Sequence, residues 1–218
     1  MPNPFGFELP SSLVGRFVRL DALVEEDAAQ IASALLGADR SSFAWAPVPA
    51  DDGDEDGQVS AEQAVAERLE QRRLGTWIPF VQRRLQPDGS VEVVGMTNFL
   101  TIERYRGPDA PPWSVEIGGT WLVPNAQRSP INTEAKLLLM THAFDVWKVR
   151  RLQVKTDSRN ERSRRAIERL GATFEGVLRN WQPGSGPGGV GAPRDTAMYS
   201  VVDSQWPEVR AQLASRLL

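Results

Sequence analysis

The chain has 218 residues, a formal net charge of −3 at pH 7, one histidine and no cysteine. The lack of cysteine excludes disulfides, thiolate metal sites and a cysteine nucleophile, and with His142 as the single histidine we expect no metal centre. The negative charge argues against a general nucleic-acid binder, whose affinity depends on neutralising phosphates. No apolar run approaches the roughly 20 residues needed to span a bilayer, and the N-terminal residues lack the features of a secretory signal. We therefore expect a soluble, cytoplasmic protein without nucleic-acid or membrane partners.

At this length, one large domain spanning residues 1–218 is the natural expectation. Hydrophobic periodicity and turn residues predict alternating strands and helices. In chain order, the predicted elements are a strand at 16–20, helices at 27–36 and 60–74, strands at 77–85, 91–102 and 113–123, a helix at 133–147, a strand at 151–156, a helix at 161–170, strands at 173–181 and 196–202, and a terminal helix at 206–218. This order is typical of an α/β fold with a mixed sheet.

Local signals support several of these elements. Ser60 and Gln63 form a capping box at the start of the second helix. The Gly118-Gly119 pair inside a strand predicts a bulge or the close approach of another backbone. Five glycines and three prolines in residues 183–193 predict a mobile hairpin loop. The acidic run at 51–56 lies in a Pro- and Asp-rich loop and is expected to be solvated or to attract a cationic ligand.

Three motifs between residues 113 and 179 carry the strongest functional signal. The first is the strand-like run Val115-Glu116-Ile117-Gly118-Gly119-Thr120-Trp121-Leu122, and the second is the turn Gln127-Arg128-Ser129-Pro130-Ile131-Asn132, which opens onto the helix at 133–147. The third is Asn160-Glu161-Arg162-Ser163, which opens the next helix. A turn that leads into a helix N-terminus presents free N–H groups and a positive dipole end. Residues 148–169 add nine Lys/Arg against three acids, so the sequence predicts an anion site here.

Taken in this order, the motifs resemble the GNAT acyltransferases that use acetyl-CoA, and within them the RimJ/RimL-like protein N-acetyltransferases. The resemblance covers residues 14–203 and is sharpest between Glu116 and Gly171. It implies a mixed central sheet flanked by helices, whose fourth and fifth strands (113–123 and 151–156) splay apart to admit the pantetheine arm. It also implies acetyl-CoA as co-substrate and an amine as acceptor, and it allows a homodimer.

The resemblance also implies a set of cofactor-binding residues. GNAT proteins carry Q/R-x-x-G-x-G/A in the loop that wraps the CoA pyrophosphate, and here Pro130 and Asn132 replace the two small residues. Proline removes one N–H donor, which puts CoA affinity in doubt, whereas the following Thr133-Glu134-Ala135 matches the T-E-A of RimJ/RimL-like chains. The cofactor contacts expected from the resemblance are Leu122, Val123, Gln127, Arg128, Ser129, Ile131, Asn132, Thr133 and Asn160. Asn160 is expected to bond the pantetheine amide, to cap the helix, or to do both.

Two residues are candidates for catalysis. Glu116 matches the E-I-G-x-W strands of the family and is either the base that takes the proton of the amine or a structural carboxylate. Ser163 occurs at the serine position of RimL-like enzymes, and the spacing places it on the buried face of its helix. Many GNAT enzymes have a tyrosine acid four residues later, where this chain has Ile167. We therefore expect Ser163 to protonate the departing CoA thiolate.

These residues favour an enzyme that acetylates a primary amine by direct attack in a ternary complex, most readily the N-terminus of a protein or peptide. A small cationic amine, such as a polyamine or an aminoglycoside, is the alternative acceptor. The altered loop and the missing tyrosine leave a third hypothesis, a CoA-binding sensor without activity. Trp45, in the loop at 41–57, either packs in the core or forms a wall of the acceptor groove.

Overall fold

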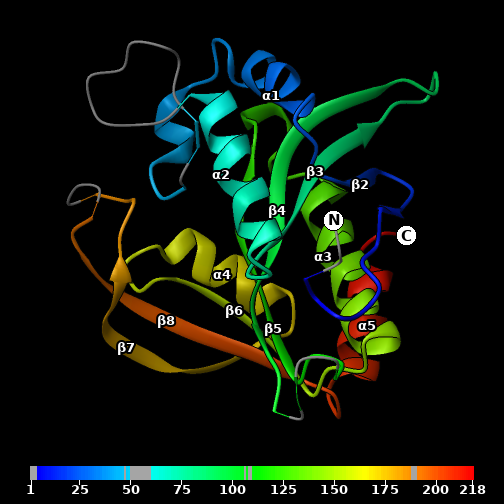
Figure 1. The fold of residues 1–218 in the computed structure, drawn as a ribbon, viewed down its shortest axis with the longest axis vertical. Coiled ribbons are helices and arrows are strands. Elements are labelled where there is room, and N and C mark those ends of the chain that lie inside the picture. The colour runs from blue at the N-terminus through cyan, green and yellow to red at the C-terminus, as the bar shows by residue number, and fades with distance from the viewer. Residues whose placement is uncertain (1–3, 47, 50–59, 106, 108–109, 188–190) are drawn as a thin grey trace.

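The computed structural model describes residues 4–46, 48–49, 60–105, 107, 110–187 and 191–218, and the acidic run at 51–56 lies outside them. All strands of the described residues belong to one eight-stranded sheet in the order β1-β2-β3-β4-β5-β6-β8-β7 (Figure 1). The strands are β1 Ser12–Val14, β2 Val18–Ala22, β3 Ile78–Leu85, β4 Val91–Glu103, β5 Ser114–Leu122, β6 Arg151–Asp157, β7 Thr173–Pro183 and β8 Pro193–Val202. Neighbouring strands are antiparallel except β5 and β6, which are parallel. The expectation of a mixed sheet flanked by helices is confirmed.

The helices lie on both faces of this sheet. The α-helices are α1 Asp27–Leu35, α2 Ala61–Arg73, α3 Pro130–Thr141, α4 Glu161–Arg169 and α5 Trp206–Ser215, and a π-helical turn, His142–Val146, continues α3. Figure 1 shows α1 and α2 on one side of β3 and β4 and α3 with α5 on the other. None of the described helices is long and apolar enough to cross a membrane.

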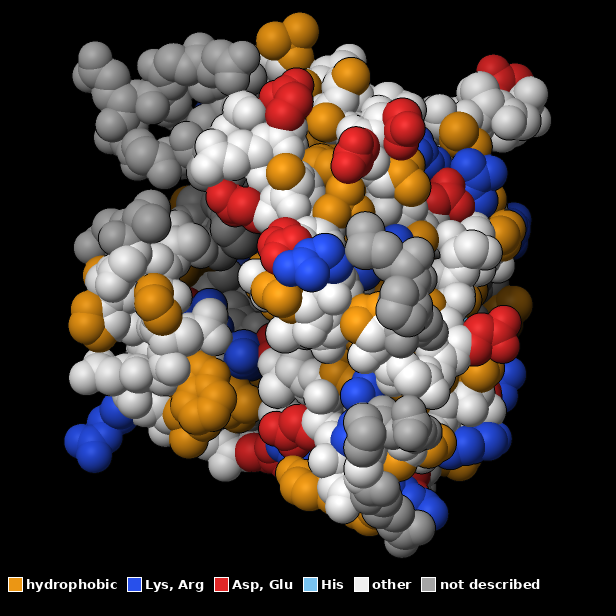
Figure 2. All heavy atoms as spheres, in the orientation of Figure 1, with side chains coloured by type: hydrophobic (Ala, Val, Ile, Leu, Met, Phe, Trp, Pro, Cys, Tyr) orange, Lys and Arg blue, Asp and Glu red, His pale blue; other side chains and the backbone are white. Residues whose placement is uncertain are grey.

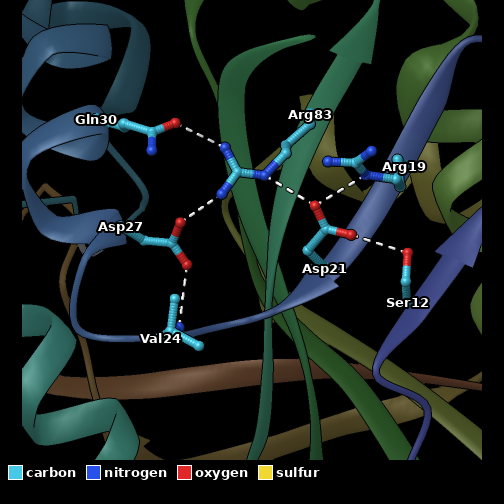
Figure 3. A network of polar contacts seen from close by, with 7 residues as sticks. All are labelled: Ser12, Arg19, Asp21, Val24, Asp27, Gln30 and Arg83. Atoms are coloured by element: carbon cyan, nitrogen blue, oxygen red, sulfur yellow. Dashed lines mark hydrogen bonds and ion pairs between the residues drawn. The ribbon is translucent and has the colours of Figure 1, made fainter.

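The sheet and α1 are joined by a polar network around Arg83 of β3 (Figure 3). The Arg83 guanidinium donates to Asp21 of β2 at 2.9 Å, to Gln30 of α1 at 2.7 Å and to the buried Asp27 at the start of α1. Asp27 also accepts from the backbone N–H of Val24 at 3.0 Å. Because its charge is matched and its hydrogen bonds are satisfied, this buried network fixes where α1 begins relative to the sheet.

Most predicted elements are present, with differences at their ends. Ser60 caps α2 by accepting from the N–H of Gln63 at 3.2 Å, but the Gln63 side chain donates to Glu67 and does not close the predicted box. The helix predicted at 133–147 begins at Pro130, because Ser129 is its N-cap. The three-residue strand β1 was not predicted. It pairs with β2 across a turn at Gly15.

Candidate active site

The central feature of the site is the point where the sheet opens between β5 and β6. These strands pair over three residues, Ser114–Glu116 against residues 151–153, and the described residues beyond Glu116 have no β6 partner. On its other edge β5 stays paired with β4, but the register shifts between Gly118 and Trp121. The predicted splay and the predicted bulge at Gly118-Gly119 are both confirmed. Past Glu116 the edge of β5 that faces β6 is left free.

Glu116 lies at this opening and is only 3% exposed. Its Oε2 forms an ion pair with Lys155 Nζ of β6 at 2.8 Å and accepts a hydrogen bond from the Thr101 hydroxyl at 2.9 Å. Thr101 has a φ of 47°, which is rare for a β-branched residue and holds its hydroxyl toward the carboxylate. Among the described residues no donor bonds Oε1. The carboxylate is therefore anchored through one oxygen and keeps the other free for a ligand.

Glycine is required beside this free oxygen. A Cβ on Gly118 would lie 2.7 Å from Glu116 Oε1 and 2.7 Å from Leu100 Cδ1. On Gly119, which has a φ of 58°, it would lie 2.5 Å from the amide nitrogen of Asn98. The bulge predicted for the glycine pair is present, whereas the atoms that approach the two glycines belong to side chains and not to another backbone.

Two tryptophans border the opening. Lys155 Nζ lies 5.8 Å from the centroid of the Trp181 ring on β7, and Arg159 Cζ lies 5.3 Å from the Trp45 ring. Trp45 also contacts the β7–β8 hairpin, because a Cβ on Gly186 would lie 2.4 Å from its Cε3. This position is the one expected if Trp45 forms a wall of a groove. Figure 2 shows a hollow on this face between the hairpin and the helical part of the molecule.

The hairpin itself is more regular than predicted. Its strands extend to Pro183 and Pro193, and Gly184 donates its N–H to Ala192 O at 2.8 Å. Residues 188–190 of the predicted loop lie outside the described part of the chain. The predicted hairpin is therefore confirmed, whereas its mobility stays a prediction.

The N-terminus of α3 forms the second part of the site. The Ser129 hydroxyl caps the helix: it accepts from the N–H of Ile131 at 3.3 Å and donates to Ala126 O at 2.6 Å. Pro130 occupies the first helical position, where an N–H has no partner within the helix anyway. The proline therefore removes less from the loop than its sequence position suggested. The N–H groups of Ser129, Ile131 and Asn132 belong to the end of the helix that lacks intrahelical acceptors.

The N-terminus of α4 lies next to that of α3. Gln127 links the two, because its Nε2 donates to Leu122 O at 2.9 Å and its Oε1 accepts from the Arg162 guanidinium. Asn160 caps α4 by accepting from the N–H of Ser163 at 3.0 Å, which is one of the roles predicted for it. The Ser163 hydroxyl is half-buried, and none of the described residues bonds it.

The remaining cofactor candidates lie around this junction. Leu122 and Val123 are buried at the end of β5, and the N–H of Val123 is used by Val94 O at 2.9 Å. Arg128 is exposed with a φ of 60°, and Thr133 is half-buried in the first turn of α3. All the predicted site residues therefore lie near the opening or at the two helix N-termini.

Sequence reasoning missed several residues of this site. Lys155 and Thr101 hold Glu116, and Arg162 of α4 donates to Gln127. A signal for Lys155 was available, because residues 153 and 155 share a face of their strand. It could be used only once the pairing of Glu116 with Gln153 was known.

Comparison with known proteins agrees with this geometry. Residues 18–173 match the family profile "Acetyltransferase (GNAT) domain". A GCN5-related N-acetyltransferase from Brucella melitensis is 27% identical with a TM-score of 0.76, over 97% of this chain and 87% of that one. A candidate acetyltransferase from T. thermophilus is 32% identical with a TM-score of 0.73, over 97% and 100%. Mycobacterium smegmatis RimJ, solved with CoA-disulfide, shares the fold at 21% identity and a TM-score of 0.68, over 91% and 88%. The curated proteins gave no significant match.

Proposed function

We propose, on the premise that this chain belongs to the GNAT family of acetyltransferases, that its acceptor is the α-amine of a protein or peptide N-terminus. Membership of this family makes the protein an acetyl-CoA-dependent N-acetyltransferase. The observation that carries the proposal is the end of β5–β6 pairing at Glu116, beside two adjacent helix N-termini. We also propose that residues 1–218 form a single domain of this kind.

The residues around the opening fit acetyl-CoA. Phosphates are favoured at helix N-termini, and here the N–H groups of Ser129 and Asn132 would face them together with Gln127, Arg128 and Thr133, whereas the N–H of Ile131 already donates to the Ser129 hydroxyl. Arg162 adds a cation at the same place. The free edge of β5, with Leu122 and Val123 at its end, would line the pantetheine arm, and the side-chain amide of Asn160 would donate to it.

In this proposal the chemistry divides between Glu116 and Ser163. The amine nitrogen forms a bond to the thioester carbonyl carbon as the carbon–sulfur bond breaks, so the nitrogen must lose a proton and the thiolate must gain one. The free Oε1 of Glu116 takes the proton directly or through a water. The Ser163 hydroxyl, which no described residue bonds, donates to the thiolate and is reprotonated from solvent. A cysteine acyl-enzyme is excluded because the chain has no cysteine.

Two features support the assignment of the acceptor: the hollow beside the β7–β8 hairpin and the similarity to RimJ/RimL-like proteins. The hollow between the β7–β8 hairpin and the helical part of the molecule (Figure 2) is open to solvent, as a chain terminus would require. RimJ shares this fold at low identity, and the acceptor class itself rests on the resemblance of the sequence motifs to RimJ/RimL-like protein N-acetyltransferases.

The test is turnover of acetyl-CoA with a panel of short peptides, a polyamine and an aminoglycoside. We expect release of free CoA together with a mass increase of one acetyl group on the peptide N-terminus. Acetylation of the polyamine or the aminoglycoside but of no peptide would contradict the proposed acceptor and identify a small cationic amine in its place. CoA binding without turnover for every amine would contradict the enzymatic proposal and favour the sensor.

A further inference from the structure

Arg194 on β8 is a half-buried guanidinium without a counter-ion among the described residues. Its Nε donates to the Thr196 hydroxyl at 3.0 Å, and no other side chain of the described residues bonds its two terminal nitrogens. Burial lowers the pKa of Arg194, although Asp157 and Glu116 act in the opposite direction. A partly buried charge is usually paired, so the lack of a partner calls for an explanation.

The sheet register places Arg194 beside the proposed active site. Thr196 pairs directly with Asp157 of β6, and residues two apart on a strand share a face. Lys155, Asp157, Thr196 and Arg194 therefore line the same face of the sheet as Glu116, which is ion-paired to Lys155. The charge of Arg194 interacts with those of Asp157 and Glu116, which places its guanidinium beside the proposed site.

The carboxylates near Arg194 already form ion pairs or hydrogen bonds with other groups. Glu116 pairs with Lys155 at 2.8 Å, and Asp157 accepts three hydrogen bonds from Arg159, at 2.8, 2.9 and 3.0 Å. Asp195, next to Arg194 in sequence, accepts from the N–H of Asn180 at 2.9 Å. Among the described residues none of these three carboxylates forms an ion pair with Arg194, and the free edge of its guanidinium is the fork of two nitrogens that matches a carboxylate.

We infer that Arg194 binds a carboxylate of the acceptor, so that the preferred substrate carries an acidic group close to its amine. This inference rests on the N-acetyltransferase activity in the proposed function: an acidic side chain near a peptide N-terminus would narrow the proposed acceptor, and a free amino acid would replace it. The carboxylate has two sources, the α-carboxylate of a free amino acid or an acidic side chain at the start of a peptide. Because the Thr196 hydroxyl accepts from Arg194 Nε, the two terminal nitrogens of the guanidinium point away from Thr196. This orientation favours bidentate binding of a carboxylate from either source.

The experiment compares matched acceptors that differ in one charge. Alanine against alaninamide tests the α-carboxylate, and the C-terminal amides of Ala-Glu-Ala and Ala-Gln-Ala test the acidic side chain. We expect kcat/KM to favour the acid in one of the pairs by about 10- to 100-fold, as expected for a charge-assisted bidentate contact. Preference in the first pair identifies a free amino acid, and preference in the second identifies an acidic peptide.

Arg194→Gln should remove the preference while leaving KM for acetyl-CoA unchanged, and Arg194→Lys should retain part of it. The control is Arg169→Gln, an exposed arginine of α4. An unchanged preference in Arg194→Gln, or equal rates for acid and amide in the wild type, would overturn the inference and leave the proposed function intact. If no amine is turned over, the proposed function fails. Binding of the same four acceptors to the CoA complex then decides the inference, which is overturned if Arg194→Gln binds acid and amide as the wild type does.

Discussion

The carboxylate of Glu134 occupies the space that a side chain in place of Gly15 would fill. Glu134, buried on α3, accepts three backbone hydrogen bonds from the β1–β2 turn, from Arg16 at 2.7 Å, Phe17 at 2.6 Å and Val18 at 2.8 Å. A Cβ on Gly15 would lie 2.4 Å from its Cδ. The glutamate of the T-E-A motif, which supports the family resemblance, therefore joins α3 to the edge of the sheet.

Gly15→Ala should lower the free energy of unfolding by about 1–3 kcal/mol, since the added methyl overpacks the site and displaces the carboxylate. Glu134→Ala should also destabilise, because it leaves three N–H groups without their acceptor. Denaturant unfolding of the two single variants and the double variant forms a cycle. We expect the double variant to lose less than the sum, because the methyl group introduced by Gly15→Ala then meets no carboxylate. Strict additivity would contradict this account.

Lys136 gives a prediction about pH. Its ammonium is buried on α3 and donates to Thr97 Oγ1 at 3.1 Å and Thr120 Oγ1 at 2.6 Å, and burial lowers its pKa to about 7. Between this value and the ordinary pKa of 10.5, the unfolded chain binds more protons than the folded one. The free energy of unfolding should therefore rise with pH over this window, by about 5 kcal/mol for a fully buried lysine.

Lys136→Met should remove this rise and stabilise the protein more at pH 6 than at pH 10. The two threonine hydroxyls lie 2.9 Å apart and can bond each other when the ammonium is gone. Denaturant titrations at several pH values measure the effect, with the exposed Lys148→Met as the control. An equal effect of Lys136→Met at pH 6 and pH 10 would show that Lys136 does not titrate in this range.

Local signals predicted most of this fold, because the residues that fix a helix end or a hairpin are close in sequence. The Ser60 cap and the Gly118-Gly119 bulge are examples. The bonds of Glu134 to Arg16, Phe17 and Val18 could not be predicted, since they join residues 116 to 118 positions apart.

In the candidate site too, features set by neighbouring residues could be predicted, and contacts between distant residues could not. Gln127 and Asn160 could be identified from motifs, but their partners depend on how two helices meet. The ion pair of Glu116 with Lys155 requires the parallel register of β5 and β6, which no local pattern specifies. Pro130 was expected to weaken the loop, and its place at the first position of α3 became clear only when Ser129 was seen to cap the helix.

Arg162 should contribute to CoA affinity. CoA should raise the melting temperature of the wild type, because a ligand bound only by the folded state stabilises it. Arg162→Gln should weaken CoA binding by about 3- to 10-fold, the loss of one hydrogen bond, as measured by calorimetry. Arg169→Gln, at the other end of α4, should bind like the wild type. Equal losses in both variants would indicate a diffuse charge effect, and no thermal shift with millimolar CoA would contradict the cofactor site.

Ser163→Ala should lower kcat by about 10²-fold, the low end for a general acid, because a CoA thiolate leaves partly unaided. KM for acetyl-CoA should change little. The backbone N–H of Ser163, which donates to the capping side chain of Asn160, is retained in this variant, so the helix should stay intact. Weaker CoA binding at an unchanged kcat would reassign Ser163 to holding the cofactor, and a change in stability alone would make its role structural.

The most direct test of the account is the rate of N-acetylation by Glu116→Gln, measured under saturating acetyl-CoA with the best amine found for the wild type. Because glutamine also leaves Lys155 unpaired, Lys155→Met and the double variant are measured beside it. If Glu116 accepts the proton of the amine, kcat/KM should fall by about 10²- to 10⁴-fold in Glu116→Gln and in the double variant, and much less in Lys155→Met. Wild-type rates in the double variant would contradict the account, since Glu116 would then serve only to balance the charge of Lys155.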